Sequence, residues 1–165
     1  MRELKQLHKD AIPAALEKAE RYRLLNEPGE AESICLDVLE VDPGNQKARI
    51  SMLLALTDQF PHDGRAYHRA CEALAGVTGE YERAYYGGVI AERRAKAQVH
   101  RVTGVTQGVY EWLRDAMDNY ERAESLRPPG NADARLRWNA CVRFLERHPE
   151  LTPASQERAE LEMLE

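Results

Sequence analysis

The sequence predicts an all-α protein built from helical hairpins, and three observations carry this prediction. Alanine (22) and leucine (18) far outnumber valine plus isoleucine (13), a mixture that favours helices because alanine and straight-chain residues lose little entropy there. Turn clusters divide the 165 residues into stretches whose apolar positions recur every three or four residues. Finally, Pro43-Gly44-Asn45 recurs as Pro129-Gly130-Asn131, 86 positions later, which indicates an internal repeat.

The first four predicted helices cover residues 12–25, 29–41, 46–59 and 64–76. Each is separated from the next by a turn cluster rich in Asn, Asp, Gly or Pro, the residue types that most often interrupt helices. The third begins directly after Asn45, whose side-chain oxygen is expected to cap a backbone N–H group of the first turn. Residues 1–11 form a polar leading segment.

The last four predicted helices cover residues 80–101, 108–127, 132–147 and 153–163. In the sixth helix, the apolar residues from Val109 to Leu126 step by three or four positions and form one continuous stripe. The seventh follows Asn131 as a capping residue and ends before Pro149, and the eighth begins at a proline, which the first helical position tolerates. We expect this eighth helix to belong to an acidic C-terminal segment, residues 148–165.

The first two predicted helices and the turn after them carry a set of residues at characteristic separations: Ala19, Tyr22, Ala31, Cys35 and Pro43. These separations match the pattern W-x2-L-G-x2-Y, A-x3-F, P, so the chain over about residues 12–147 resembles the tetratricopeptide repeat family. The predicted units are residues 12–45, 46–80 and 81–131, followed by a closing helix at 132–147. The second unit is degenerate and the third is expected to be a longer hairpin.

The resemblance implies a right-handed α–α superhelix of about three hairpins plus closing C-terminal helices. Each hairpin in such an array buries its faces against its neighbours. In the family, the first helices of the hairpins line a concave groove that binds a protein or peptide. Carried over to this chain and its neighbouring positions, that groove is expected to contain Leu16, Glu20, Arg23, Met52, Tyr85, Val89, Glu92, Arg93, Lys96, Asn139 and Arg143.

The sequence contains no recognisable catalytic motif. We find no nucleophile motif, phosphate-binding loop or metal-ligand spacing, so the sequence predicts a protein that is not an enzyme and needs no cofactor or metal. Cys35, Cys71 and Cys141 lie far apart among apolar positions and are expected to be core residues. The polar start lacks a secretory signal, and no run approaches the roughly 18 apolar residues of a membrane span, so the expected location is cytoplasmic, away from the membrane.

Charge suggests the character of the partner. The formal net charge of −5 argues against a general nucleic-acid binder, because the phosphate backbone selects for positive surfaces. Arginine nevertheless outnumbers lysine 18 to 5, with several arginines gathered in residues 127–148, while residues 149–165 are mainly acidic. Two interpretations of these charges stay open: an ordinary solvated face, or a basic groove for acidic peptides, since guanidinium groups bind carboxylates in a bidentate manner. The family resemblance implies an adaptor or scaffold for a protein or peptide partner, and the second interpretation would make that partner acidic.

Two other functions remain open at this point. The same surfaces could serve a structural subunit of a homo- or hetero-oligomeric assembly, in which the groove is permanently covered. A nucleic-acid-binding regulator rests on the arginine excess alone. The acidic C-terminal segment could in addition compete for a positive wall made by Arg93, Lys96 and Arg143.

Overall fold

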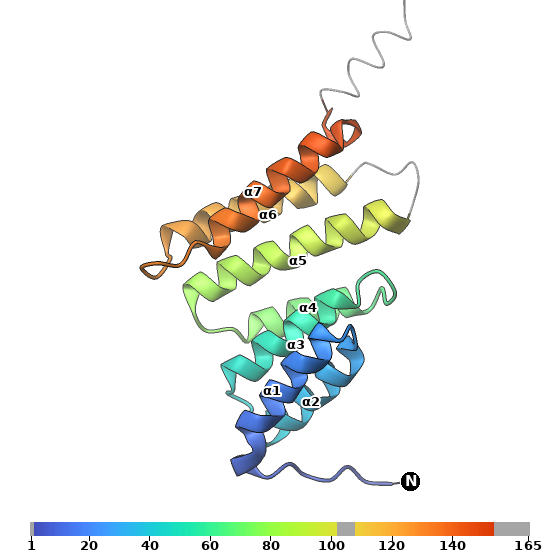
Figure 1. Ribbon diagram of the computed structural model, residues 1–165, viewed down its shortest axis with the longest axis vertical. Coiled ribbons are helices and arrows are strands. Elements are labelled where there is room, and N and C mark those ends of the chain that lie inside the picture. Colours follow the sequence, from blue (N-terminus) through green and yellow to red (C-terminus); the bar gives the residue numbers. More distant parts are fainter. Residues whose placement is uncertain (1, 102–107, 154–165) are drawn as a thin grey trace, which may run out of the picture. The chain divides into compact units, whose positions relative to one another are not determined.

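The computed structural model describes residues 2–101 and 108–153, and in these ranges the regular structure is entirely helical (Figure 1). The all-α class predicted from composition and periodicity is therefore confirmed. The α-helices are α1 (Ile12–Leu24), α2 (Pro28–Val41), α3 (Gln46–Asp58), α4 (Ala66–Ala75), α5 (Glu80–Arg101), α6 (Val109–Ser125) and α7 (Asp133–Arg147). Two short 3-10 turns, η1 (Lys9–Ala11) and η2 (Pro149–Leu151), flank them.

The helix ends differ from the predicted ones by a few residues, for local reasons. Helix α4 begins at Ala66 rather than 64, because the Asp63 side chain accepts a hydrogen bond from the Arg65 backbone N–H (2.9 Å) and holds the preceding turn. Directly after α7 the chain forms η2 and not a continuous acidic helix. The predicted eighth helix, 153–163, lies outside the described residues beyond its first position.

The chain divides into two compact units, residues 1–79 and 80–165. In unit 1, α1 pairs with α2 and α3 pairs with α4, and α3 packs on both helices of the first pair. In unit 2, the long helices α5 and α6 pair with each other, and α7 packs on α6. Short turns join consecutive helices in unit 1, and a short turn also joins α6 to α7 in unit 2.

The core of unit 1 consists largely of small side chains, which allow helices to approach closely. One cluster contains Ala19, Ala31, Cys35 and Ala55, with Tyr22 at its edge. Ala19, Ala31 and Cys35 are three of the residues that the sequence analysis aligned with the repeat pattern. Burial raises the pKa of the Cys35 thiol to about 12, so this group stays protonated at neutral pH.

The predicted role of the two asparagines is borne out in one case and altered in the other. Asn45 caps α3, since its side-chain oxygen accepts a hydrogen bond from the Ala48 N–H (2.9 Å). Asn131 accepts from the Asp133 N–H (2.9 Å), but it lies one position before the N-cap, which is Ala132. Its oxygen also accepts a hydrogen bond from the Tyr81 hydroxyl (3.1 Å), which ties the start of α5 to the α6–α7 turn.

Candidate functional site

The most unusual feature of unit 2 is a buried acidic side chain, Glu92 of α5, whose exposed fraction is 2%. Its carboxylate is held by three side chains, one from each helix of the unit. The Tyr120 hydroxyl of α6 donates a hydrogen bond to Oε2 (2.6 Å), Lys96 Nζ of α5 lies 2.5 Å from Oε1, and Arg137 Nη1 of α7 lies 3.3 Å from Oε2. Glu92 therefore connects all three helices through charge-assisted contacts.

The local sequence explains how the network forms. Gly88, Glu92 and Lys96 are four residues apart and share one face of α5. At Gly88 a Cβ atom would lie 2.8 Å from Cδ1 of Tyr120, so the absence of a side chain is what admits the tyrosine ring. Tyr120 is fully buried, and its position against Gly88 places the hydroxyl beside the Glu92 carboxylate.

Electrostatics keep this site ionised. Burial alone would raise the pKa of Glu92, but hydrogen bonds from Lys96 and Tyr120 and the positive charges of Lys96 and Arg137 more than compensate, and the net effect is a lowered pKa. Burial would lower the pKa of Arg137, whereas the charge of Glu92 and a hydrogen bond with Tyr85 raise it above its ordinary value. The acid and the guanidinium therefore both carry charge at neutral pH.

Aromatic rings border the network on its α5 side. Tyr81 and Tyr85 are stacked, with ring centroids 5.9 Å apart and planes within 9° of each other. Tyr85 also meets Tyr86 edge-on (5.0 Å) and Tyr120 in a tilted contact (5.9 Å). At the other end, the Lys96 ammonium lies 5.4 Å from the ring centre of Phe144 in α7. We call the group of Tyr81, Tyr85, Glu92, Lys96, Arg137 and Phe144 the α5–α7 seam.

Among the six residues of the seam, two carry a positive charge and one carries a negative charge. Two cations, Lys96 and Arg137, share the single carboxylate of Glu92, and their side chains are 32% and 30% exposed. The Glu92 side chain itself is 2% exposed. Water and any ligand therefore meet the cations and not the acid, so this surface can bind a negatively charged group through donors that Glu92 leaves available.

Two of the predicted groove residues are corrected by their burial. Leu16 packs in a cluster with Val38 and Ala48 of unit 1, and its exposed fraction is 4%. Val89 is fully buried. Apolar side chains at these helical positions contribute to the core, and neither is available to contact a partner.

Three further predicted residues lie in unit 1 and have structural contacts. Arg23 of α1 is largely buried and donates from Nε to Asp58 of α3 (2.9 Å), which joins two helices of the unit. Glu20, one turn earlier, is half-exposed and pairs with the same guanidinium (3.3 Å). Met52 packs, partly buried, against the small-residue cluster of the core.

The remaining predicted residues lie in unit 2, where Tyr85 and Lys96 belong to opposite ends of the seam. Arg93 is half-buried on α5, and Asn139 and Arg143 lie on α7, the first half-buried and the second exposed. Of the expected wall of Arg93, Lys96 and Arg143, Lys96 pairs with the buried Glu92 carboxylate and stays about one-third exposed.

The sequence prediction missed the central contacts of the seam. Glu92 was expected on the groove surface and is buried, and Tyr120 and Arg137 were not candidates for the site. One available signal was the position of Glu92 within an otherwise apolar α5 stripe that includes Gly88 and Ala95. A lone acid in such a stripe needs a partner from another helix, because a buried charge without one is strongly unfavourable.

Comparison with protein-family models, with curated proteins and with solved structures finds no match to this chain. Over the residues that the structure describes, no helix combines the length and the apolar character required to cross a membrane. The same part of the chain contains no group of three or more side chains placed to ligate a metal ion.

Proposed function

We propose that this chain is a tetratricopeptide-like adaptor without catalytic activity, acting in the cytoplasm, and that it binds an acidic protein segment along the α5–α7 seam. The observation that carries the proposal is the charge balance of the seam, in which two half-exposed cations share one buried carboxylate. A right-handed superhelical array of hairpins is part of this proposal. The pairing of α1 with α2 and of α3 with α4, and the packing of α3 on the first pair, support it.

The seam offers two kinds of contact to such a segment. Arg137 uses Nη1 for Glu92, and a planar guanidinium has further N–H donors that can bind a ligand carboxylate. The Tyr81–Tyr85 stack supplies a half-buried aromatic surface next to it. A ligand with an apolar anchor and a flanking Asp or Glu satisfies both, and tyrosine and arginine are the residue types that most often dominate binding energy.

A peptide selection on the purified protein tests this function. Random twelve-residue peptides displayed on phage should be enriched for sequences that combine an aromatic or aliphatic residue with Asp or Glu. The affinity of a selected peptide, measured by fluorescence anisotropy, should fall at least tenfold in Lys96→Gln and weaken with added salt.

The matched control for this test is Lys47→Gln, which removes an exposed positive charge from α3 of unit 1. The affinity should be the same as in the wild type. Selection of peptides without acidic enrichment, or equal affinity in Lys96→Gln and the wild type, contradicts the proposal.

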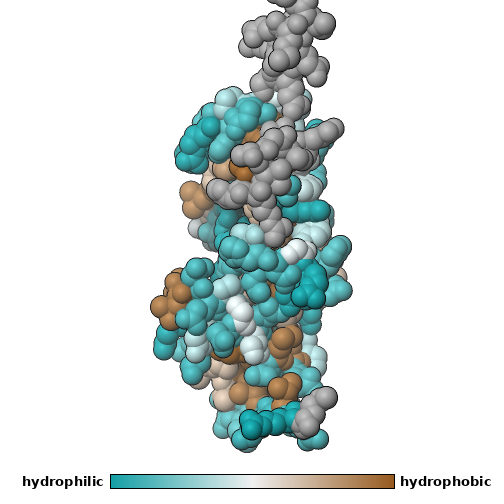
Figure 2. All heavy atoms as spheres, turned by 90° about the vertical axis from the view of Figure 1, so that its right-hand side faces the viewer, coloured by the Kyte–Doolittle hydropathy of each residue, from teal (hydrophilic) through white to brown (hydrophobic). Residues whose placement is uncertain are grey.

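A structural subunit of an oligomer is the second candidate, favoured by exposed leucines in unit 1. Leu24 and Leu25 at the end of α1 are 80% and 63% exposed, and Leu36 of α2 is 53% exposed. Figure 2 shows one face of the molecule, on which apolar side chains form separate patches among hydrophilic ones. A mass that stays oligomeric across a dilution series, and falls on Leu36→Glu, would favour this function over the adaptor.

A further inference from the structure

Unit 1 has an open groove on the paired helices α1 and α2, with a volume of about 330 Å³. Its apolar lining consists of Leu7, Ala11, Ala14, Ala15 and Ile34. Two side chains of opposite charge complete it, Lys18 of α1 and Asp37 of α2. We call these residues the α1–α2 groove. An apolar surface with a charged border is typical of a site that binds another protein.

The helical spacing of α1 produces the apolar side of the groove. Ala11, Ala14, Ala15 and Lys18 lie three or four positions from their neighbours along the helix, so they share one face. Ala14 is exposed, and Ala15 is half-buried. Because methyl side chains project little from the helix, this face allows another helix to approach closely.

The two charges of the groove have no partner in their own chain. Lys18 and Asp37 are both exposed, and within residues 2–101 and 108–153 neither side chain forms an ion pair or a hydrogen bond. They belong to different helices, so the groove carries a positive charge on its α1 side and a negative charge on its α2 side. Both charges are therefore available to a molecule that covers the groove.

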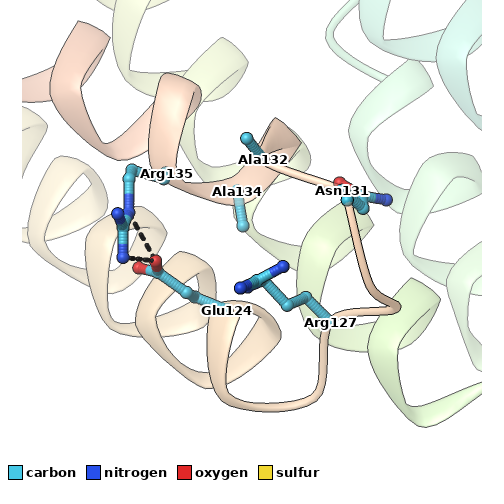
Figure 3. Close-up of a pocket in the computed structure, with 7 residues that line it drawn as sticks. Glu124, Arg127, Asn131, Ala132, Ala134 and Arg135 are labelled. Carbon is cyan, nitrogen blue, oxygen red and sulfur yellow. Dashed lines mark hydrogen bonds and ion pairs between the residues drawn. The ribbon is translucent and has the colours of Figure 1, made fainter.

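A pocket at the α6–α7 turn of unit 2, with a volume of about 200 Å³, has the opposite arrangement. Its wall contains Glu124 of α6 and Arg135 of α7, and these two side chains form an ion pair with each other (Figure 3). These two charges are balanced within the chain, so the pocket does not offer them to a partner. The α1–α2 groove differs because its two charges remain unpaired.

The charge pattern of the α1–α2 groove is complementary to itself. A two-fold axis that runs along the groove, between the two helices, places α1 of one copy over α2 of the other. Lys18 of each copy then faces Asp37 of the other copy, and the apolar linings of the two grooves meet between these pairs. One surface thus satisfies both its charges and its apolar residues by binding a second copy of itself.

We infer that two copies of this chain dimerise through the α1–α2 groove, with two Lys18–Asp37 ion pairs at the border of an apolar contact. The apolar contact supplies most of the affinity, and the exposed ion pairs fix the orientation. The dimer goes beyond the adaptor function and does not depend on it, because no residue of the α5–α7 seam lines the groove. A dimer carries two seams, so a partner with two acidic segments would bind both.

Exchange of the two charges tests the inference in the full-length chain. By analytical ultracentrifugation, the wild type should be a reversible dimer at about 100 μM protein. Lys18→Glu places two acids opposite each other at each border, and Asp37→Lys places two cations there. Each variant alone should therefore dimerise at least tenfold more weakly than the wild type.

An equimolar mixture of the two variants should dimerise about as tightly as the wild type. In the mixed dimer, the substituted acid of one variant faces the substituted lysine of the other, and the remaining Asp37 faces the remaining Lys18. A wild type that stays monomeric, equal dimerisation of Lys18→Glu and the wild type, or a mixture that associates no more tightly than its components would each overturn the inference.

Two controls locate the interface. Lys47→Glu reverses an exposed charge on α3, outside the groove, and should dimerise like the wild type. Leu36→Glu changes an exposed leucine that does not line the groove and should also keep the dimer. Dissociation by Leu36→Glu and not by Lys18→Glu would overturn the inference and place the interface at the exposed leucines of unit 1.

Ala14→Glu tests the apolar part of the contact. Ala14 lies in the first turn of α1, where an acidic side chain favours the helix, so the thermal unfolding midpoint should not fall. Dimerisation should weaken at least tenfold, because the new charge would be buried against an apolar surface. The control is Ala132→Glu, which adds the same charge at an exposed alanine of unit 2 and should keep the dimer. Wild-type affinity in Ala14→Glu would contradict the dimer.

Discussion

Burying the Glu92 carboxylate removes it from water, and side chains from three helices replace the lost hydration. Burial and the neighbouring carboxylate both raise the pKa of the Tyr120 phenol. The hydroxyl therefore stays protonated and can donate its hydrogen bond to Glu92. The network is therefore complete only with an ionised acid, a protonated phenol and two cations.

The first prediction concerns the pH dependence of unit 2. The folded-state pKa of Glu92 is lowered below its ordinary value of 4.5, so its stabilising contribution is present above about pH 4.5 and is lost as the pH falls through the folded-state pKa. At neutral pH, Glu92→Gln should reduce the free energy of unfolding by about 2 kcal/mol, because it removes a charged hydrogen-bond partner from a buried site.

The measurement is urea unfolding followed by tryptophan fluorescence, since Trp112 and Trp138 are the two tryptophans of the chain and both lie in unit 2. The stability difference between wild type and Glu92→Gln should shrink as the pH is lowered below about 4.5. A difference that stays constant from neutral pH down to pH 3 would show that folding does not lower the pKa of this carboxyl group.

For single residues, the sequence predicts the position on a helix better than the side chains that each residue contacts. The placement of Tyr85 and Lys96 on α5 followed from the periodicity of that one helix. The burial of Glu92 did not, because it depends on Tyr120 and Arg137, which are 28 and 45 positions away. Contacts at such separations are set by how three helices pack and not by a local pattern.

Among the elements, the pairing of α5 with α6 depends on one glycine. Gly88 lies within α5, where glycine lowers helix stability relative to alanine by about 1 kcal/mol. The close approach of the Tyr120 ring explains why glycine is nevertheless suitable at position 88. The ring cannot swing aside without breaking its hydrogen bond to Glu92.

The second prediction follows from this contact. Gly88→Ala should destabilise unit 2 by about 1–3 kcal/mol, because the added methyl group overlaps the buried tyrosine ring. The control is Gly29→Ala in α2, where a Cβ atom would meet nothing within 4 Å and the higher helix propensity should leave stability unchanged or increase it. Thermal unfolding by circular dichroism compares the two. An equal effect of both substitutions would argue against the packing constraint.

Helix positions were predicted well where capping and turn residues are local. The start of α3 after Asn45 and the end of α7 before Pro149 follow from residues adjacent to those ends. The start of α7 was displaced by one residue, because Asn131 also accepts a hydrogen bond from Tyr81, 50 positions earlier. A tertiary contact thus modifies a local preference.

For the whole molecule, the division into two units has a measurable consequence, which is the third prediction. Leu16→Ala removes a buried side chain from the core of unit 1 and should cost about 2–5 kcal/mol there. Because each unit has its own core, the unfolding midpoint seen by tryptophan fluorescence should stay unchanged, while the circular dichroism transition splits into two steps. A parallel shift of both signals would mean that the chain unfolds as one cooperative body.

The two cations of the seam already have an acid of their own, and this sets a threshold for any acidic ligand. Glu92 acts as an intramolecular competitor: a ligand carboxylate gains only the donors that Glu92 leaves unused on Lys96 and Arg137. If the seam binds an acidic segment as proposed, a single exposed acid should gain little over water, whereas a segment presenting several carboxylates next to an apolar anchor should gain enough to bind. The buried glutamate would thus make the surface selective, because proteins that present few carboxylates would bind too weakly. Specificity would come from competition by Glu92 and not from additional contacts with the ligand.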